Sequence, residues 1–366
     1  IRGGTLAIIG DNALGAWNAA LEINGGTLET MTYVAIGRPV MFAGDGGLHT
    51  HSGIGLSGTL AGSGRITKTG IGHLHLMGSG DHSGGIDLVE GELYLDGDYA
   101  AAGGTITVRS GTRLGGTMGS YGGDVVVEDG GTLAPGAFGV AAGTLEFGGD
   151  LVLSANSKLE FHLGAAGTEG GDFNDLVRVG GDLVLAGTLD LYVHPDGAFG
   201  PGVYTLFTYG GALTYDPGTF ALGAQPAGST LSLRTSVPGK VLLVNGTGFV
   251  FRYWDGGAGN RYDGVFDGGS GTWSLAPGDE NWTNEDARVN GGFVNGQVAV
   301  FTGAPGTVTI DNSHGAVEAA GLEFRTDGYV ITGDALTLAG PFADITVDDG
   351  VSATIAAELA GATQLV

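Results

Sequence analysis

The chain has 366 residues, including 76 glycines, 10 prolines and no cysteine, and its formal net charge is −25. Without cysteine, a disulfide framework and thiol catalysis are excluded. The 14 basic residues face 39 acidic ones, which excludes a basic surface for nucleic-acid phosphates and disfavours anionic membranes. The sequence contains no run of ~18 apolar residues, so no membrane-spanning helix is expected.

Short strands are expected from the first residues onward, because apolar and polar residues alternate between frequent glycines. Ala13–Leu21 and Val351–Leu359 are the two segments that most resemble helices. Neither sustains a period of 3.6 residues, so we expect strand and loop in both. The sequence therefore predicts an all-β protein.

From Ile66 onward the sequence repeats at an interval of roughly 20 residues, which is within the range of repeat architectures. The repeated positions are apolar residues that each lie in a short alternating run: Ile66, Ile86, Ile106, Val126 and Leu145. Glycine pairs such as Gly84-Gly85 lie between these runs and predict sharp turns. A unit of this size cannot bury its own apolar face, so successive units must stack into a parallel β-helix.

Residues 60–95 contain the most specific pattern, LAGSGRITKTGIGHLHLMGSGDHSGGIDLVEGELYL. It resembles the passenger-associated transport repeat of bacterial autotransporters. The matching positions are Ile66, Thr67, Lys68, Gly70, Gly72, Leu74, Leu76, Gly78, Gly84, Gly85, Gly91 and Leu93. The match departs from the family at Asp81 and Ser83, where Asn and Tyr are usual, and at His73 and His75, where outward Thr is usual.

Two further stretches are similar to passenger sequences: the opening GGTLAIIGDNALGAWNAALEINGGTLET, and the tryptophan-bearing segment from Tyr253. The resemblance implies a right-handed parallel β-helix with about 20-residue coils. It also implies a passenger segment on the surface of a Gram-negative bacterium, or secreted, whose translocating C-terminal barrel lies outside these residues. We expect residues 1–248 and 249–366 to be sections of one continuous solenoid, truncated at both ends.

Histidines are concentrated in one part of the chain, where His49, His51, His73 and His75 form two i, i+2 pairs. Alternation along the second pair directs Leu74 inward and both histidines outward. The pairs are separated by about one coil, so they would stack. Stacked imidazoles could bind zinc, nickel or copper or respond to pH, although a strand surface also accepts His simply in place of Thr.

Other candidate sites favour structural roles. Arg65, Lys68, Arg109 and Arg113 form the only basic cluster, which is thin for a lyase of acidic polysaccharides. Gly62-Ser63-Gly64 is a turn rather than the elbow of a serine hydrolase.

Two more patterns require a choice between function and packing. GGDFNDLV at residues 170–177 resembles a single calcium-binding repeat, but Asp172 and Asp175 are expected to bond their own backbone in a turn. Aromatic residues could form an exposed binding platform, but packing is favoured for Tyr253, Trp254, Tyr262, Trp273 and Trp282.

The sequence is therefore interpreted as a non-enzymatic passenger segment, without a cofactor, that acts in adhesion. Its expected partners are host or matrix components, or other copies of itself, and weak contacts along a long surface would add up through multivalency. Two alternatives remain: a passive stalk that presents a distal domain, and a polysaccharide-processing β-helix enzyme.

Overall fold

The computed structural model describes all residues except 137–141, 249, 258, 340–341, 362–363 and 366. The described chain is a parallel β-solenoid with one short 3-10 helix, η1 (Asp11–Leu14). It divides into two compact units, the first comprising Ile1–Gly200, Tyr204–Ser229 and Pro238–Leu243, and the second comprising the remainder. The proposed boundary at residue 248 and the continuity of the solenoid remain predictions.

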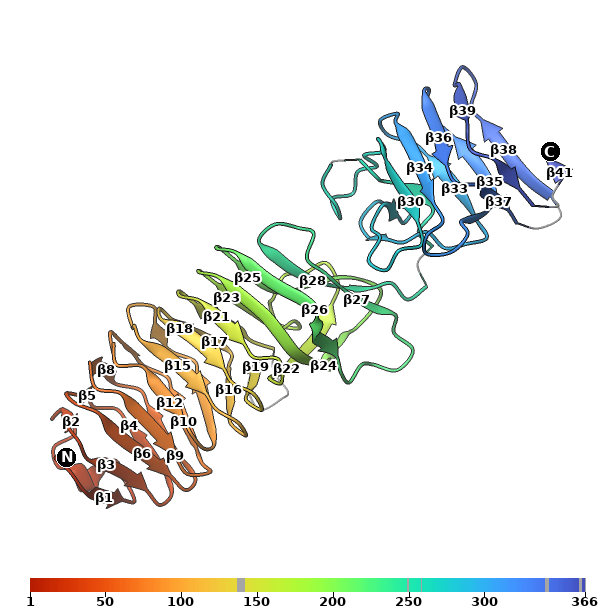
Figure 1. The fold of residues 1–366 in the computed structure, drawn as a ribbon. Helices are drawn as coiled ribbons and strands as arrows, with labels where there is room; N and C mark the ends of the chain where they lie inside the picture. The colour runs from red at the N-terminus through yellow and green to blue at the C-terminus, as the bar shows by residue number, and fades with distance from the viewer. Residues whose placement is uncertain (137–141, 249, 258, 340–341, 362–363, 366) are drawn as a thin grey trace. The chain divides into compact units, whose positions relative to one another are not determined.

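The coils of the first unit contribute strands to three parallel ladders (Figure 1). Ladder 1 consists of β1 (Thr5–Ile8), β3 (Thr27–Thr30), β6 (Gly46–Thr50), β9 (Ile66–Thr69), β12 (Ile86–Leu88), β15 (Thr105–Val108), β18 (Asp124–Val127) and β21 (Leu151–Leu153). Ladder 2 consists of β4 (Tyr33–Ile36), β7 (Gly53–Leu56), β10 (His73–Leu76), β13 (Glu92–Leu95), β16 (Arg113–Gly116), β19 (Thr132–Pro135) and β22 (Lys158–Ala165). Both ladders continue into two long strands, β24 (Leu183–Ala198) and β26 (Leu213–Leu222).

Ladder 3 forms a separate sheet on the third side of the coil. Its strands wholly or mostly in this unit are β2 (Leu21–Ile23), β5 (Val40–Phe42), β8 (Thr59–Gly62), β11 (Ser79–Gly80), β14 (Asp98–Tyr99), β17 (Met118–Tyr121), β20 (Thr144–Phe147), β23 (Leu176–Val179), β25 (Gly202–Tyr209) and β28 (Lys240–Asn245).

The core of the first unit is a set of vertical stacks of inward side chains. One stack in ladder 2 comprises Val34, Ile54, Leu74, Leu93, Leu114, Leu133, Leu159 and Leu189, all buried and joined by strand register. Fully burying such a side chain contributes about 1.5–3 kcal/mol, and each coil gains it only against its neighbours. This confirms that apolar residues of successive coils point into a shared solenoid interior.

The repeat length stays close to its expected value only in the first part of the unit. In ladder 2 the register partner of Ile54 is Leu74, but that of Leu133 is Leu159, so the later coil is several residues longer. The predicted series of apolar positions is wrong at its last two members. Val125, not Val126, is the register partner of Ile106, and Leu145 lies in ladder 3. The coil before Val125 is one residue shorter, and a one-residue shift exchanges the two faces of a strand.

Glycines mark a corner where consecutive coils nearly touch. A Cβ on Gly64 would lie 1.9 Å from the carbonyl oxygen of Gly44, and one on Gly84 would lie 2.2 Å from that of Gly64. These positions lie between ladder 3 and ladder 1. Here glycine is required by the close approach of backbones rather than by a turn conformation alone.

The expectation for Ala13–Leu21 is wrong at its start, because Ala13 and Leu14 belong to η1. The cause is Arg38, which is buried and fills the centre of this segment. Its guanidinium donates to the carbonyl oxygens of Leu14 at 3.0 Å and Ala16 at 2.9 Å, and to Asp11 Oδ1 at 2.8 Å. These carbonyls converge on one cation, which holds the chain in a tight turn.

The second unit is also built mainly of parallel coils. Its strands are β27 (Leu231–Arg234), β29 (Tyr253–Trp254), β30 (Gly271–Ser274), β31 (Trp282–Thr283), β32 (Asn290–Gly291), β33 (Gln297–Phe301), β34 (Thr307–Asp311), β35 (Glu318–Phe324), β36 (Tyr329–Gly333), β37 (Leu336–Leu338), β38 (Phe342–Val347), β39 (Ala353–Ile355), β40 (Leu359–Ala360) and β41 (Gln364–Leu365). β29, β31 and β32 pair antiparallel, whereas the coils that follow pair in parallel, as Phe301 does with Phe324.

Strand and loop in Val351–Leu359 are confirmed by β39 and the start of β40.

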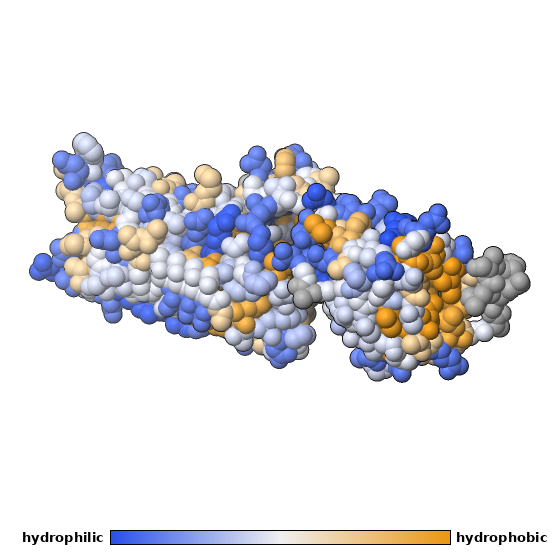
Figure 2. Space-filling model, turned by 90° about the horizontal axis from the view of Figure 1, so that it is seen from above, coloured by the Kyte–Doolittle hydropathy of each residue, from blue (hydrophilic) through white to orange (hydrophobic). Residues whose placement is uncertain are grey.

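Hydrophilic residues are spread along both units in the view of Figure 2, while hydrophobic residues gather on one face of the second unit. Among the described residues, no helix has the length and apolar character needed to cross a membrane.

Candidate functional site

His49 lies on the outer surface of ladder 1, and His51 lies at the corner that follows the strand. Alternation in β6 turns Leu48 and Thr50 inward, which leaves the two histidines on the outside with ring centroids 4.9 Å apart. Glu29 of the preceding coil is the register partner of His49, and its Oε1 lies 2.8 Å from Nε2 of His51. The nitrogen and oxygen donors of these three residues all lie within 4.8 Å of one another.

The neighbouring coil on the other side also contacts this group. Thr69 of β9 is the second register partner of His49, and its Oγ1 lies 2.9 Å from Nδ1 of His49. The sequence analysis identified the two histidines but missed Glu29 and Thr69. The repeat interval contained the signal, since Glu29 precedes His49 by one coil and Thr69 follows it by one coil.

His73 and His75 belong to ladder 2 and do not stack on the first pair. The register partner of His73 in the coil before is Gly53, so the expected stacking of the two pairs is wrong. His49 and His73 are separated by more than one coil of sequence. The extra residues take the chain around the corner from ladder 1 into ladder 2. Each pair is therefore a separate feature of the surface.

The second pair is packed more tightly into its surroundings. His75 Nε2 lies 2.6 Å from Asp96 Oδ2, and the His73 ring lies 5.6 Å from Tyr33 and 5.9 Å from Tyr94 between centroids. Burial, with a smaller effect from the charge of His75, lowers the pKa of His73. His73 is thus held toward its neutral form among aromatic neighbours.

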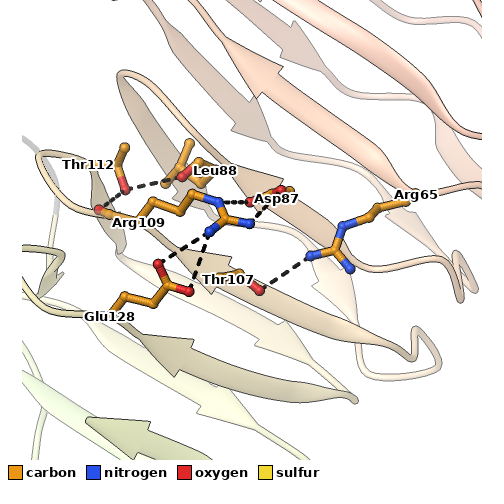
Figure 3. A network of polar contacts seen from close by, with 7 residues as sticks. All are labelled: Arg65, Asp87, Leu88, Thr107, Arg109, Thr112 and Glu128. Atoms are coloured by element: carbon orange, nitrogen blue, oxygen red, sulfur yellow. Dashed lines mark hydrogen bonds and ion pairs between the residues drawn. The ribbon is translucent and has the colours of Figure 1, made fainter. Parts of the chain in front are cut away.

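Arg109 of the basic cluster is neutralised by carboxylates beside ladder 1 (Figure 3). Arg109 donates to both carboxylate oxygens of Asp87, at 2.6 and 3.0 Å, and approaches Glu128 at 3.3 Å. Arg65 instead donates to Thr107 Oγ1 at 3.4 Å. The bidentate pair between Arg109 and Asp87 fixes the Arg109 guanidinium between adjacent coils.

The remaining two members of the cluster are also engaged. Arg113 pairs with Glu160 two coils away. Lys68 points inward in the core stack between Leu48 and Leu88 and is fully buried. Burial lowers its pKa to about 8, while the nearby Glu90 acts in the opposite direction. The cluster therefore does not present four free cations to an acidic polymer.

The Lys68 ammonium is satisfied by backbone oxygens. Its Nζ donates to the carbonyls of Thr69 at 3.0 Å, Gly70 at 2.8 Å and Glu90 at 3.0 Å. These oxygens lie at the corner where the chain leaves β9 and in the coil above it. Sequence reasoning attributed Lys68 to the repeat pattern but missed this structural role, although alternation from Ile66 places it on the inward face.

Asp175 is a buried acceptor rather than a local turn residue. It accepts hydrogen bonds from the backbone amides of Gly143 and His162, each at 2.7 Å, across 32 and 13 residues. Burial raises the pKa of this carboxyl group. The expectation that Asp175 bonds its own nearby backbone is wrong, because the aspartate instead fastens adjacent coils.

The tryptophans of the second unit form a buried core. Trp254, Trp273 and Trp282 are each 0% exposed, and the Trp273 and Trp282 rings lie 4.9 Å apart. Phe293 and Phe301 pack against the same rings. The expected packing role of the tryptophans is confirmed, so they do not form an exposed aromatic platform.

The chain is similar in sequence to a known protein. The chain is 44% identical over 241 residues, 64% of its length, to the adhesin BmaC autotransporter of Brucella suis biovar 1 (strain 1330). The chain spans 7% of the length of that relative. No family model matches the sequence.

Proposed function

We propose that this chain, a homologue of an autotransporter adhesin with the β-solenoid of an autotransporter passenger, is an adhesive segment of such a passenger. The observation that carries the proposal is the 44% identity to the Brucella adhesin. The segment would lie at the surface of a Gram-negative cell or be secreted. Its partners would be host or matrix components, or other copies of the chain.

A row of exposed side chains supports contact with another surface. Ile9, Met31, His51 and Ile71 follow register-paired positions of ladder 1, so they occupy the same corner of successive coils. We call this row the corner stripe. Ile9, Met31 and Ile71 are 76%, 48% and 86% exposed. Apolar side chains lined up in this way provide contact area that a single exposed residue does not.

The remaining surface supports many weak contacts rather than one deep site. Outward positions repeat from coil to coil, so any contact made by one coil can be made again by the next. Several such contacts add through effective concentration. Arg109 and Arg113 are paired with Asp87, Glu128 and Glu160, which supports a non-catalytic role over cleavage of an acidic polysaccharide.

The test is to display the segment on a non-aggregating bacterial cell and to measure both sedimentation and attachment to host cells and matrix proteins. Adhesion predicts a gain in at least one measurement, reduced by Ile71→Asp in the corner stripe. Met118→Asp is the matched control, because Met118 is 82% exposed but lies in ladder 3. No gain in either measurement would favour a passive stalk, and turnover of an acidic polysaccharide would favour an enzyme.

A further inference from the structure

We propose that Glu29, His49 and His51 form a binding site for one zinc ion on the outer face of the first unit. Two imidazoles and a carboxylate are a common ligand set for zinc. Their donor atoms already lie within 4.8 Å of one another. Donors bound to one zinc at about 2.0–2.1 Å in tetrahedral geometry are roughly 3.3 Å apart, so small side-chain rotations complete the site.

The strands hold the three ligands from two coils. Glu29 and His49 are outward register partners on β3 and β6, and their backbones are fixed by the ladder. His51 lies two residues further along the same outward side, and its side chain is 46% exposed, which leaves it free to rotate. The scaffold thus sets the positions while the exposed ring adjusts the distances.

Thr69 prepares His49 for metal binding. Its Oγ1 lies 2.9 Å from Nδ1 of His49. When Nδ1 donates its proton to this hydroxyl, Nε2 carries the free lone pair. A hydrogen bond to the second ring nitrogen is the usual way in which proteins orient a metal-bound histidine.

Zinc would take the place of the proton between His51 and Glu29. These groups are joined by the 2.8 Å contact between Nε2 and Oε1. On binding, that hydrogen bond is replaced by bonds from zinc to His51 Nε2 and Glu29 Oε1, and the neutral His51 ring carries its one proton on Nδ1. Three protein ligands leave a fourth position for water, and the net charge of −25 favours a cation nearby.

The experiment is calorimetric titration of the whole chain with Zn²⁺ at neutral pH. We expect one zinc per chain and at least ~100-fold weaker binding in His49→Ala and in His51→Ala. Thr69→Val, which keeps all three ligands, should weaken binding by ~10-fold. The matched control is the double variant His73→Ala/His75→Ala on ladder 2, which should bind zinc as the wild type does.

Glu29→Gln keeps the size of the side chain and should also weaken binding, which guards against loss through misfolding. Each variant is compared with the wild type by circular dichroism in metal-free buffer. The proposal is overturned if the wild type gives no binding heat, if His49→Ala and His51→Ala bind normally, or if the His73/His75 control loses zinc equally.

Discussion

Substitution Gly64→Ala should strongly destabilise the first unit. The added methyl carbon would lie 1.9 Å from the carbonyl oxygen of Gly44, whereas ordinary contacts begin at 3.4 Å. The obstruction is backbone, so no side-chain rotation relieves it. The coils must separate at this corner, which breaks the 2.9 Å hydrogen bond from the Gly64 amide to Phe42. Overpacking costs about 1–3 kcal/mol and the lost hydrogen bond about 0.5–1.5 kcal/mol, giving roughly 1.5–4.5 kcal/mol.

Urea unfolding followed by far-ultraviolet circular dichroism measures this loss. Gly37→Ala is the matched control: Gly37 is exposed, and the nearest atom to its added methyl is Ser57 Oγ at 3.7 Å. We expect a change within about 0.5 kcal/mol for this variant. If Gly64→Ala unfolds at the same urea concentration as Gly37→Ala, the close approach of coils at this corner is not what requires glycine.

Three further outcomes follow from contacts described above. Burial lowers the pKa of Lys68 from 10.5 to about 8, so between these pH values Lys68 is mainly protonated in the unfolded state and mainly neutral in the folded state. The free energy of unfolding, relative to that of Lys68→Met, should therefore rise by up to about 1.4 kcal/mol per pH unit in this range. Unfolding curves of both proteins from about pH 8 to 9.5 test this, and a constant difference would contradict it. Trp273→Ala should cost about 3–5 kcal/mol in urea unfolding, because it empties a fully buried site, and a cost below about 1 kcal/mol would count against that packing. Arg109→Met should lower the urea midpoint only slightly, because Arg109 is 41% exposed and its ion pairs are screened by solvent, and the difference should shrink further in high salt; a large loss that high salt does not reduce would contradict this.

The fold followed from the sequence where apolar and polar residues alternate without interruption. Leu74 and Leu76 are inward and His73 and His75 outward, as alternation predicts. The prediction failed at Val126, because a coil one residue shorter reverses the face of each residue and nothing in a single strand reveals its partner's register. The longer coil after Leu133 was not predicted either, because the sequence of one strand does not show which residue of the next coil is its register partner.

The candidate site was predicted in part. Counting along the chain found His49 and His51 but grouped them with His73 and His75, which the corner at Ser52 places in another ladder. Applying the repeat interval to His49 alone would have selected Glu29 and Thr69. The inward position of Lys68 was also within reach of alternation. Its stability there depends on three carbonyl oxygens whose convergence no sequence pattern shows.

The location of the tryptophans gives the protein an intrinsic fluorescent reporter. Trp254, Trp273 and Trp282 all lie in the second unit and are shielded from water, while Trp17, the fourth tryptophan of the chain, belongs to the first unit and is 80% exposed. A red shift of the emission on denaturation therefore arises almost wholly from the second unit. Recorded beside circular dichroism, which senses strands in both, it would reveal whether the two halves melt together or in succession.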